Sequence, residues 1–423
     1  MSISRKTSVR IGQFFSARQS IDPRKHPDEV FDLLSIPAFD EGSPETIIGS
    51  DIGSTKLTVF PSDVLVSKIV PHIQRVWIVP PGGGRRQIAS SEWIVLRSDV
   101  ALPGYLRYAL LDSRFHAQFM ATVDGLGGSL QRARPQAVKQ IEIDLPSIPR
   151  QRSVVEYLDR ETAQIDVFIA KNLELINLLI ERRDALIART VLRGLDAAVE
   201  LLASGVEWLG DVPSHWSIQR LASTVARARN GVWGADPEGD EDDLRCVRVA
   251  DFDRSNQRIH DKVYTIRRLT ASERAGRILR SGDLLLEKSG GGEKSPVGFV
   301  VLYDRAEPAV CSNFVARVQL REQMDPAFWT YVHGAMYRLR LTEKSLKQST
   351  GIQNLDVKSY FNEFVAVPPY REQRAIAEHL DRAVAEIDTV IRAARQSVDL
   401  ARERRAALIS AAVIGEIDLG LAA

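Results

Sequence analysis

Cysteine, net charge and long apolar runs are all scarce in this chain, and each shortage excludes a class of protein. The 423 residues include only two cysteines, Cys246 and Cys311, and no apolar stretch approaches the roughly 18 residues of a membrane span. Residues 1–20 have no signal-peptide core. We therefore expect reduced, buried thiols, no membrane association and a cytoplasmic location. With 56 basic and 55 acidic side chains the net charge is +1, so any binding to a polyanion needs a local basic patch.

Motifs for catalysis and for metal binding are missing as well. The seven histidines have no metal-ligand spacing, and no cysteine pair accompanies them. Residues 289–295 include a glycine run like that of a phosphate-binding loop, but Glu293 stands where glycine must precede Lys294. Val367-Pro368-Pro369-Tyr370 resembles the (Asn/Asp)-Pro-Pro-Tyr motif of amino-methyltransferases, yet Val367 cannot hold a target amine. The sequence predicts no catalytic residue, no metal site and no bound cofactor.

An internal repeat is the most informative feature that is present. Residues 151–160 return as residues 373–382, a shift of 222 (373 minus 151). Weaker copies match residues 62–68 with 282–288, and Ser91–Val95 with Ser312–Ala316, so that Trp93 aligns with Phe314. Two copies in one chain mimic a dimer with a pseudo-twofold axis. Because the copies diverge most outside residues 150–193 and 372–415, we predict a shared scaffold with two different working surfaces.

A heptad pattern predicts two long helices of about 40 residues that pair as an antiparallel coiled coil. Asn172 interrupts the apolar seam where the second copy has Ala394, and both a register-setting buried Asn and a partly solvated Asn remain open. Gly194 and Gly415 are expected to end the helices. The predicted seam consists of Leu158, Ile165, Ile169, Ile176, Leu179, Leu186, Leu380, Ile387, Ile391, Val398 and Leu408.

The rest of the chain predicts an α+β fold with two mixed α/β domains. Glycine and proline separate short β-rich runs, such as residues 63–68, 75–79 and 93–96. We expect domains at 1–149 and 197–367, joined by helices at 150–196 and 368–423.

The order of domain, helix, domain and helix resembles the specificity (S) subunit of type I restriction-modification enzymes. The resemblance covers essentially the whole chain, although the first half lacks the Trp-Leu-Gly opening of the second. It rests on Pro368-Pro369-x-x-Glu372-Gln373 running into Leu380-Asp381, on Arg404-Arg405-x-Ala407-Leu408-Ile409, and on Trp208-Leu209-Gly210-x-x-Pro213-x-His215-Trp216.

This resemblance implies a non-catalytic subunit with two target-recognition domains, each reading one half of a bipartite site in double-stranded DNA. The helices would set the spacer between the half-sites and dock two methyltransferase (M) subunits, which use S-adenosylmethionine to methylate adenine. Restriction (R) subunits would join through the M subunits. A coiled-coil adaptor without DNA readout remains the alternative.

Two strand ends and two loops supply the candidate DNA contacts. Glycine lets backbone approach phosphate, while Gln, Asn and Arg can read base edges. Solvated strand ends, which bind nothing, remain the competing interpretation of both lysines. The candidates are Lys68, Arg75, Gln131 and Arg132 in the first copy, and Lys288, Ser289, Lys294, Gln353 and Asn354 in the second.

Overall fold

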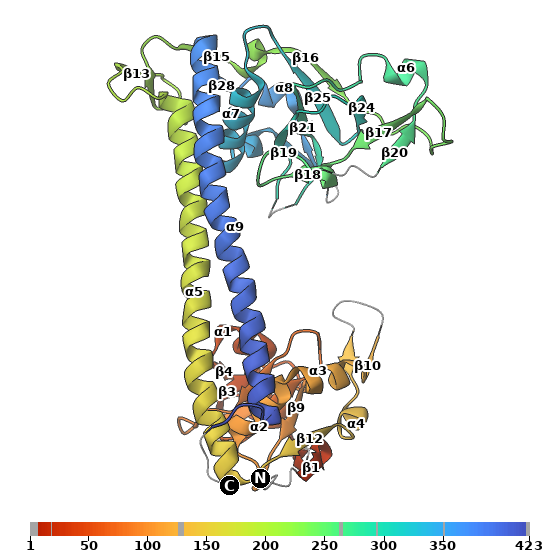
Figure 1. The fold of residues 1–423 in the computed structure, drawn as a ribbon, viewed down its shortest axis with the longest axis vertical. Coiled ribbons are helices and arrows are strands. Elements are labelled where there is room, and N and C mark those ends of the chain that lie inside the picture. Colours follow the sequence, from red (N-terminus) through yellow and green to blue (C-terminus); the bar gives the residue numbers. More distant parts are fainter. Residues whose placement is uncertain are drawn as a thin grey trace. The chain divides into compact units, whose positions relative to one another are not determined.

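A computed structural model describes residues 7–17, 19–125, 131–261, 265–292, 295–349 and 352–419, and the chain forms two compact units. Unit 1 comprises Met1–Glu174 with Ala394–Ala423, and unit 2 comprises Leu175–Ala393. Helices α5 (Ile148–Arg193) and α9 (Tyr370–Ile414) contribute to both units (Figure 1). The boundary between the two units therefore lies within α5 and α9 and not at their ends, because each end of each helix packs into the core of one unit.

Unit 1 is built from short strands and short helices around the ends of α5 and α9. Its sheets have the orders β2-β5-β8-β3-β4 and β7-β6-β9, with two-stranded pairs β1-β12 and β10-β11. The elements are β1 (Thr7–Arg10), β2 (Ser20–Ile21), β3 (Val30–Leu34), α1 (Ile36–Glu41), β4 (Glu45–Ile48), β5 (Lys56–Thr58), β6 (Val64–Ser67), β7 (Val76–Ile78), β8 (Arg86–Ala89), β9 (Trp93–Leu96), α2 (Pro103–Leu111), α3 (Ser113–Met120), β10 (Val123–Asp124), β11 (Arg132–Ala133), α4 (Pro135–Val138) and β12 (Glu142–Leu145), with 3-10 turns at Ile11–Phe14, Pro23–Lys25 and Gly49–Asp51.

The strands predicted at residues 63–68, 75–79 and 93–96 are confirmed as β6, β7 and β9 of one sheet. Every residue of β6 is buried, as expected for a central strand covered on both faces. One face meets the main core of unit 1, which also takes in Val154 and Leu158 of α5 and Ile409 of α9. The helix ends are thus part of the domain core.

Unit 2 repeats this plan with more strands. Its largest sheet has the order β16-β25-β21-β23, beside sheets β20-β17-β24 and β22-β27-β26 and the pairs β13-β14, β15-β28 and β18-β19. The elements are β13 (Leu201–Ala203), β14 (Asp211–Pro213), β15 (Ser217–Arg220), β16 (Val225–Asn230), β17 (Asp243–Val247), β18 (Phe252–Asp253), β19 (Arg258–Ile259), β20 (Ile266–Arg268), α6 (Ala271–Arg274), β21 (Asp283–Glu287), β22 (Ser289–Gly290), β23 (Val300–Tyr303), β24 (Ala309–Cys311), β25 (Val315–Leu320), α7 (Pro326–Arg338), β26 (Leu346–Ser349), β27 (Ile352–Leu355), α8 (Val357–Tyr360) and β28 (Phe364–Val367), with 3-10 turns at Leu221–Thr224, Val249–Asp251 and Leu341–Ser345.

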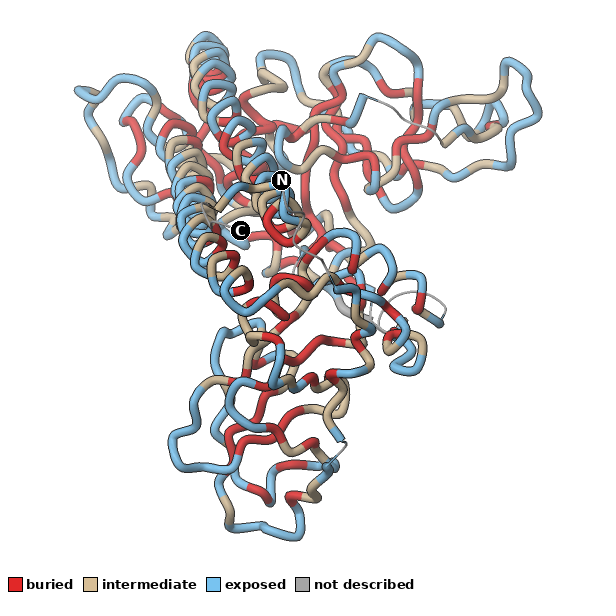
Figure 2. Tube along the Cα trace, turned by 60° about the horizontal axis from the view of Figure 1, so that its bottom comes forward, coloured by how far each residue is buried: buried red, intermediate tan, exposed pale blue. Residues whose placement is uncertain are grey.

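Buried residues gather on these strands (Figure 2). Along β21, Leu284 and Leu286 face a core that also includes Ile376 and Leu380 of α9. Leu285 points to the opposite side, into a second cluster, because successive side chains of a strand alternate between its faces. The sheet is therefore covered on both faces.

Within each unit, α5 and α9 run antiparallel. In unit 1, Arg150 donates to the carbonyl oxygen of Ile417 at 2.8 Å, and Arg405 pairs with Asp166 at 2.9 Å. In unit 2, Arg183 pairs with Asp388 at 2.7 Å. Arg405 and Asp388 are the repeat equivalents of Arg183 and Asp166, so the two units make the same ion pair with the helices exchanged, as in an isologous contact.

The ends and the seam of the long helices follow the heptad pattern. The predicted stops are confirmed, since α5 and α9 end immediately before Gly194 and Gly415, both with a positive φ. Asn172 is half-buried and donates to the carbonyl of Phe168 in its own helix at 2.9 Å. No predicted seam residue is exposed: Leu158, Ile176, Leu380, Ile391 and Val398 are buried, and Ile165, Ile169, Leu179, Leu186, Ile387 and Leu408 are half-buried.

Candidate nucleic-acid interface

In unit 2, two segments that are distant in the sequence meet at the end of β21. Strand β22 pairs with β27, which places Ser289 opposite Asn354 and Gly290 opposite Gln353. The Ser289 hydroxyl donates to Asn354 Oδ1 at 2.6 Å. Four of the predicted contact residues, Lys288, Ser289, Gln353 and Asn354, therefore form one cluster, which we call the unit 2 strand-end site.

Unit 1 has the same construction at the end of β6. Ile69 bridges to Arg132, and the amide of Ala133 donates to the carbonyl of Lys68 at 2.8 Å. The amide of Leu355 makes the equivalent bond to the carbonyl of Lys288, also at 2.8 Å. Lys68, Gln131 and Arg132 thus lie together and form the unit 1 strand-end site.

The charges of the unit 1 strand-end site are partly neutralised by Glu92. Its carboxylate lies 3.3 Å from the Arg132 guanidinium and 4.0 Å from Lys68 Nζ. The Lys68 side chain is only 22% exposed, whereas that of Arg132 is 57% exposed. Arg132 is therefore the more available cation of this site.

In unit 2 an aromatic side chain replaces that acid. The backbone amide of Lys68 donates to the carbonyl of Glu92, while that of Lys288 donates to the carbonyl of Phe314. Strand register agrees, because Ser67 faces Trp93 and Glu287 faces Val315. The sequence alignment of Trp93 with Phe314 was wrong by one residue, and Phe314 is the structural equivalent of Glu92. Among the described residues, no carboxylate forms an ion pair with Lys288.

Arg75 and Lys294 are not placed in either strand-end site, and Gln353 belongs to the unit 2 site but is buried. The Arg75 guanidinium forms two bonds to Asp40, at 2.9 and 3.1 Å, and holds the pKa of that carboxyl below its ordinary value. Its side chain is largely buried whereas that of Asp40 is half exposed, and the DNA contact of Arg75 stays a prediction. Gln353 is buried, and its Oε1 has no partner among the described residues. Lys294 lies outside the described residues.

The sequence prediction missed an arginine cluster beside the largest sheet of unit 2. Arg227 and Arg229 lie two residues apart on β16, and both Arg227 and Arg277 lie close enough to act on Arg229. Partial desolvation, and then the positive charges of Arg277 and Arg227, lower the pKa of Arg229. No carboxylate of the described residues pairs with Arg227 or Arg229. The Arg-x-Arg spacing in a strand-like segment was the available signal.

Two buried glutamines, one in each copy, anchor the domains to the helices. Gln151 accepts from the amide of Leu102 at 2.7 Å and donates to the carbonyls of Val100 and Pro146. Gln373 accepts from the amide of Asp325 at 2.9 Å and donates to carbonyls of Gln323 and Pro368. Their identity between the copies was visible in the sequence, but their role was not.

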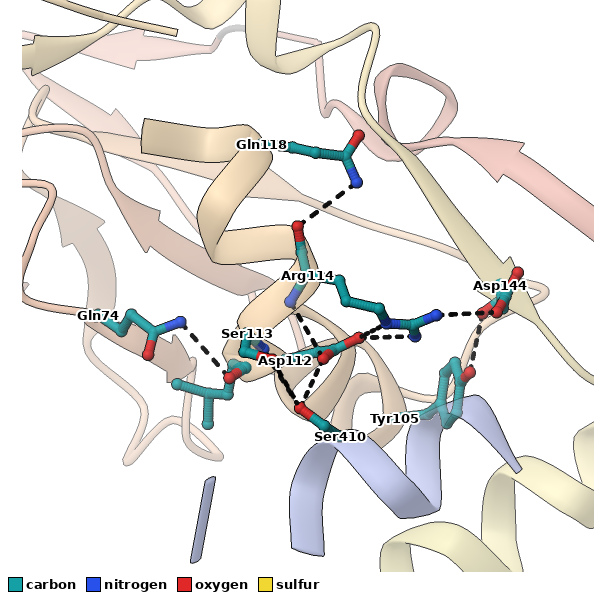
Figure 3. A network of polar contacts seen from close by, with 9 residues as sticks. Gln74, Tyr105, Asp112, Ser113, Arg114, Gln118, Asp144 and Ser410 are labelled. Carbon is teal, nitrogen blue, oxygen red and sulfur yellow. Dashed lines mark hydrogen bonds and ion pairs between the residues drawn. The ribbon is translucent and has the colours of Figure 1, made fainter. Parts of the chain in front are cut away.

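Further polar contacts strengthen each anchor. Tyr108 donates to Asp159 of α5 at 2.6 Å, and its equivalent Tyr331 donates to Asp381 of α9 at 2.7 Å. In unit 1, Asp112 also accepts from Arg114 and from the Ser410 hydroxyl of α9 (Figure 3). These contacts fix each strand-end site relative to the helix segments of its own unit.

Exposed apolar residues repeat along the long helices. Phe168 of α5 and Leu400 of α9 belong to unit 1, and their repeat equivalents Val390 and Leu178 belong to unit 2. In heptad register these residues occupy positions g and c, which lie on the same side of an antiparallel helix pair. We call them the unit 1 apolar pair and the unit 2 apolar pair.

Other kinds of site find no support in the part of the chain that the structure describes. No group of three or more His, Cys, Asp or Glu side chains there could hold a metal ion, and no described helix is long and apolar enough to cross a membrane. Both cysteines are free and buried, and burial raises the pKa of Cys246 to about 11.

Comparison with known proteins gives one curated relative and several solved structures. No family model matches the chain. The type I restriction enzyme StySPI specificity subunit of Salmonella potsdam is 22% identical over 317 residues, which cover 74% of this chain and 65% of that protein. The chain is similar to type I restriction specificity subunits. This confirms the family resemblance inferred from the repeated motifs.

One solved structure from a type I system extends the similarity to both units. A chain from a type I R-M system, solved in a study of complex assembly and conformational transition, aligns with a TM-score of 0.66 at 21% identity and covers 97% of this chain and 98% of its own length. An HsdS subunit from Thermoanaerobacter tengcongensis aligns with a TM-score of 0.46 at 21% identity, over 97% of both chains. The first alignment confirms the predicted α+β fold of two domains and two long helices.

Proposed function

We propose that this chain is the non-catalytic DNA-recognition subunit of a type I restriction-modification complex, in which each unit reads one half of a bipartite target. One observation carries this proposal: both units build the same strand-end site, with Lys and Gln at matching positions, but they differ where unit 1 has Arg132 and unit 2 has Asn354. Lys68, Gln131 and Arg132 in unit 1 correspond to Lys288, Gln353 and Asn354 in unit 2. A shared frame with changed side chains is what two readers of different short sequences require.

The arginine cluster of unit 2 supports a polyanion partner. Like charges on neighbouring side chains are unfavourable without a counter-charge, and the described residues supply none for Arg227 or Arg229. DNA phosphates would provide that charge, and such contacts fix the position of a protein on a duplex without reading sequence. We assign Arg227, Arg229 and Arg277 to backbone contacts on this ground.

We further propose that the helices dock two M subunits, one on each apolar pair. Exposed apolar residues that recur at equivalent places favour the binding of two copies of one partner. S-adenosylmethionine would bind in the M subunits and R subunits would join through them. The helices would also set the spacer, so four residues inserted into each helix, about 6 Å of added length, should lengthen the spacer by one or two base pairs.

The function is tested by methylation mapping with purified components. The chain alone should neither methylate nor cut DNA, while the chain with its M subunit should methylate one bipartite sequence. Lys288→Ala should weaken recognition of one half-site, and Arg132→Ala should affect only the other. Assembly with M but no sequence preference would contradict the proposal and favour a coiled-coil adaptor.

The docking surface is tested by stoichiometry. Replacing both Leu178 and Val390 with Glu should leave a chain that binds one M subunit, because only the unit 2 apolar pair is lost. Leu173→Glu is the matched control, since Leu173 is also exposed but lies at heptad position e, on the other side of the helix pair. Native mass spectrometry should show two M subunits with the control. Two M subunits on the double variant would place the docking surface elsewhere.

A further inference from the structure

The two strand-end sites differ in a correlated way at two neighbouring positions. Unit 1 has Glu92 and Arg132, which form an ion pair at 3.3 Å. At the equivalent positions unit 2 has Phe314 and Asn354. Both members change together, from a charged pair to an aromatic ring and an amide, while Lys68/Lys288 and Gln131/Gln353 stay the same. This pattern is expected for the positions that set specificity in each unit.

In unit 1 the geometry makes Arg132 the reading group. Glu92 accepts from one Arg132 nitrogen at 3.3 Å, and Lys68 Nζ lies 4.0 Å from the other carboxylate oxygen. Glu92 Oε1 thus orients the guanidinium, whose side chain remains 57% exposed, while the buried Oε2 has no hydrogen-bond partner among the described residues. An oriented guanidinium with free N–H groups matches the O6 and N7 acceptors of guanine in the major groove.

In unit 2 the corresponding positions hold an amide donor, Asn354, and an exposed aromatic residue, Phe314. Asn354 Oδ1 is occupied by the Ser289 hydroxyl at 2.6 Å, which leaves its NH₂ group without a partner among the described residues. Phe314 is 48% exposed, and its backbone carbonyl accepts from the amide of Ser289 at 3.3 Å, so Ser289 links the Phe314 main chain to the Asn354 side chain. Thymine is the base that offers an acceptor, O4, next to a methyl group in the major groove.

We propose that the Arg132–Glu92 pair selects a guanine in the half-site of unit 1, and that Asn354 and Phe314 select a thymine in the half-site of unit 2. This inference rests on the proposed function and adds the identity of one base in each half-site. Arg132, Asn354 and Phe314 contact the bases, whereas Glu92 and Ser289 act as positioning residues.

Base analogues test each contact atom by atom. The S–M complex is titrated with duplexes that carry the mapped target, in which each guanine in turn is replaced by 7-deazaguanine, or each thymine by uracil. For the unmodified protein, one 7-deazaguanine should weaken binding about 2- to 12-fold, because it removes N7, one of the two acceptors of a bidentate guanine contact, and keeps O6. One uracil in the other half-site should weaken binding about fourfold, because a single methyl contact is lost.

The variants decide whether these residues make the contacts. Arg132→Ala should bind the 7-deazaguanine duplex as well as the normal one and keep its sensitivity to uracil. Phe314→Ala should show the reverse. Both side chains are exposed, so folding should be preserved, and M binding provides the check. Glu92→Gln should reduce the preference for guanine over 7-deazaguanine, but by less than Arg132→Ala does.

The outcomes separate this inference from the function on which it rests. A complex with no sequence preference contradicts the proposed function itself. Alternatively, the complex reads a bipartite site while both Arg132→Ala and Phe314→Ala still lose affinity with 7-deazaguanine and with uracil. That result agrees with the proposed function and overturns the base assignment. In a third outcome, Glu92→Gln abolishes the preference for a cytosine in the unit 1 half-site, while Arg132→Ala leaves all base preferences unchanged. The carboxylate of Glu92 would then read the base, and the role proposed for Arg132 would be overturned.

Discussion

The repeated ion pair of the long helices predicts unequal effects for two chemically identical substitutions. Arg183→Gln breaks the pair with Asp388 in unit 2, and Arg405→Gln breaks the equivalent pair with Asp166 in unit 1. The carboxylate left behind differs in its access to water: the Asp388 side chain is 11% exposed and that of Asp166 is 53% exposed. The chain therefore contains its own matched control.

The expected magnitudes follow from this difference. Removing one partner of a buried pair costs about 3–5 kcal/mol, because an unpaired charge stays buried. Arg338 lies in the same network and still interacts with Asp388, so we expect a cost just below this range, about 2–3 kcal/mol, for Arg183→Gln. An exposed pair is worth about 0–1 kcal/mol, which is our expectation for Arg405→Gln.

Hydrogen exchange measured by mass spectrometry resolves the two sites in one experiment. Peptides around Asp388 should lose protection by about 30- to 150-fold in Arg183→Gln, the factor that corresponds to 2–3 kcal/mol of local opening. Peptides around Asp166 should change less than about fivefold in Arg405→Gln. Equal losses in the two variants would refute the argument that burial of the remaining carboxylate sets the cost.

Three further predictions concern pH, salt and the helix seam. Burial lowers the pKa of His333 from 6.5 to about 4, so the neutral side chain stabilises the folded state fully above pH 6.5, and this stabilisation is lost as the pH falls towards 4. In urea unfolding, the free energy of unfolding should fall by about 3 kcal/mol over this pH range. His333→Asn should largely remove this pH dependence. Arg229→Gln should reduce the salt dependence of DNA binding by about one unit of slope and weaken all sequences alike, whereas a change confined to one sequence would contradict a phosphate contact. Ile391→Asp should destabilise the chain by several kcal/mol in urea unfolding, while Val390→Asp should leave stability almost unchanged and weaken M binding; similar instability of both would place Val390 in the seam.

Local and periodic signals explain what the sequence predicted well. The heptad pattern identified α5 and α9, and the glycines at 194 and 415 located their ends, because both signals depend on neighbours within one or two turns. The repeat added the two-domain plan. Strand β6 was predicted from a short apolar run bounded by turn residues.

Contacts between distant residues explain the rest. Arg75 looked like a free cation, but its partner Asp40 lies 35 residues away in the sequence. Ser289 and Asn354 were predicted in separate loops, and only strand pairing brings them together across 65 residues. The alignment of Trp93 with Phe314 was wrong because the shift between the copies varies from 220 to 223, which apolar pattern alone does not resolve at single-residue precision.

The glutamine anchors have a consequence for how such chains can diversify. Among the described residues, Gln151 bonds only to backbone amides and carbonyls, and Gln373 does so apart from contacts with Trp329 and Met324. Backbone groups are present whatever the side chains, so the joint constrains the path of the domain's main chain far more than its composition. A domain can therefore accumulate substitutions, or be exchanged for an unrelated sequence of the same fold, and still dock on the same helices. The helices thus offer each domain the same backbone attachment, so the strand-end sites can change in sequence without altering the joint between domain and helix.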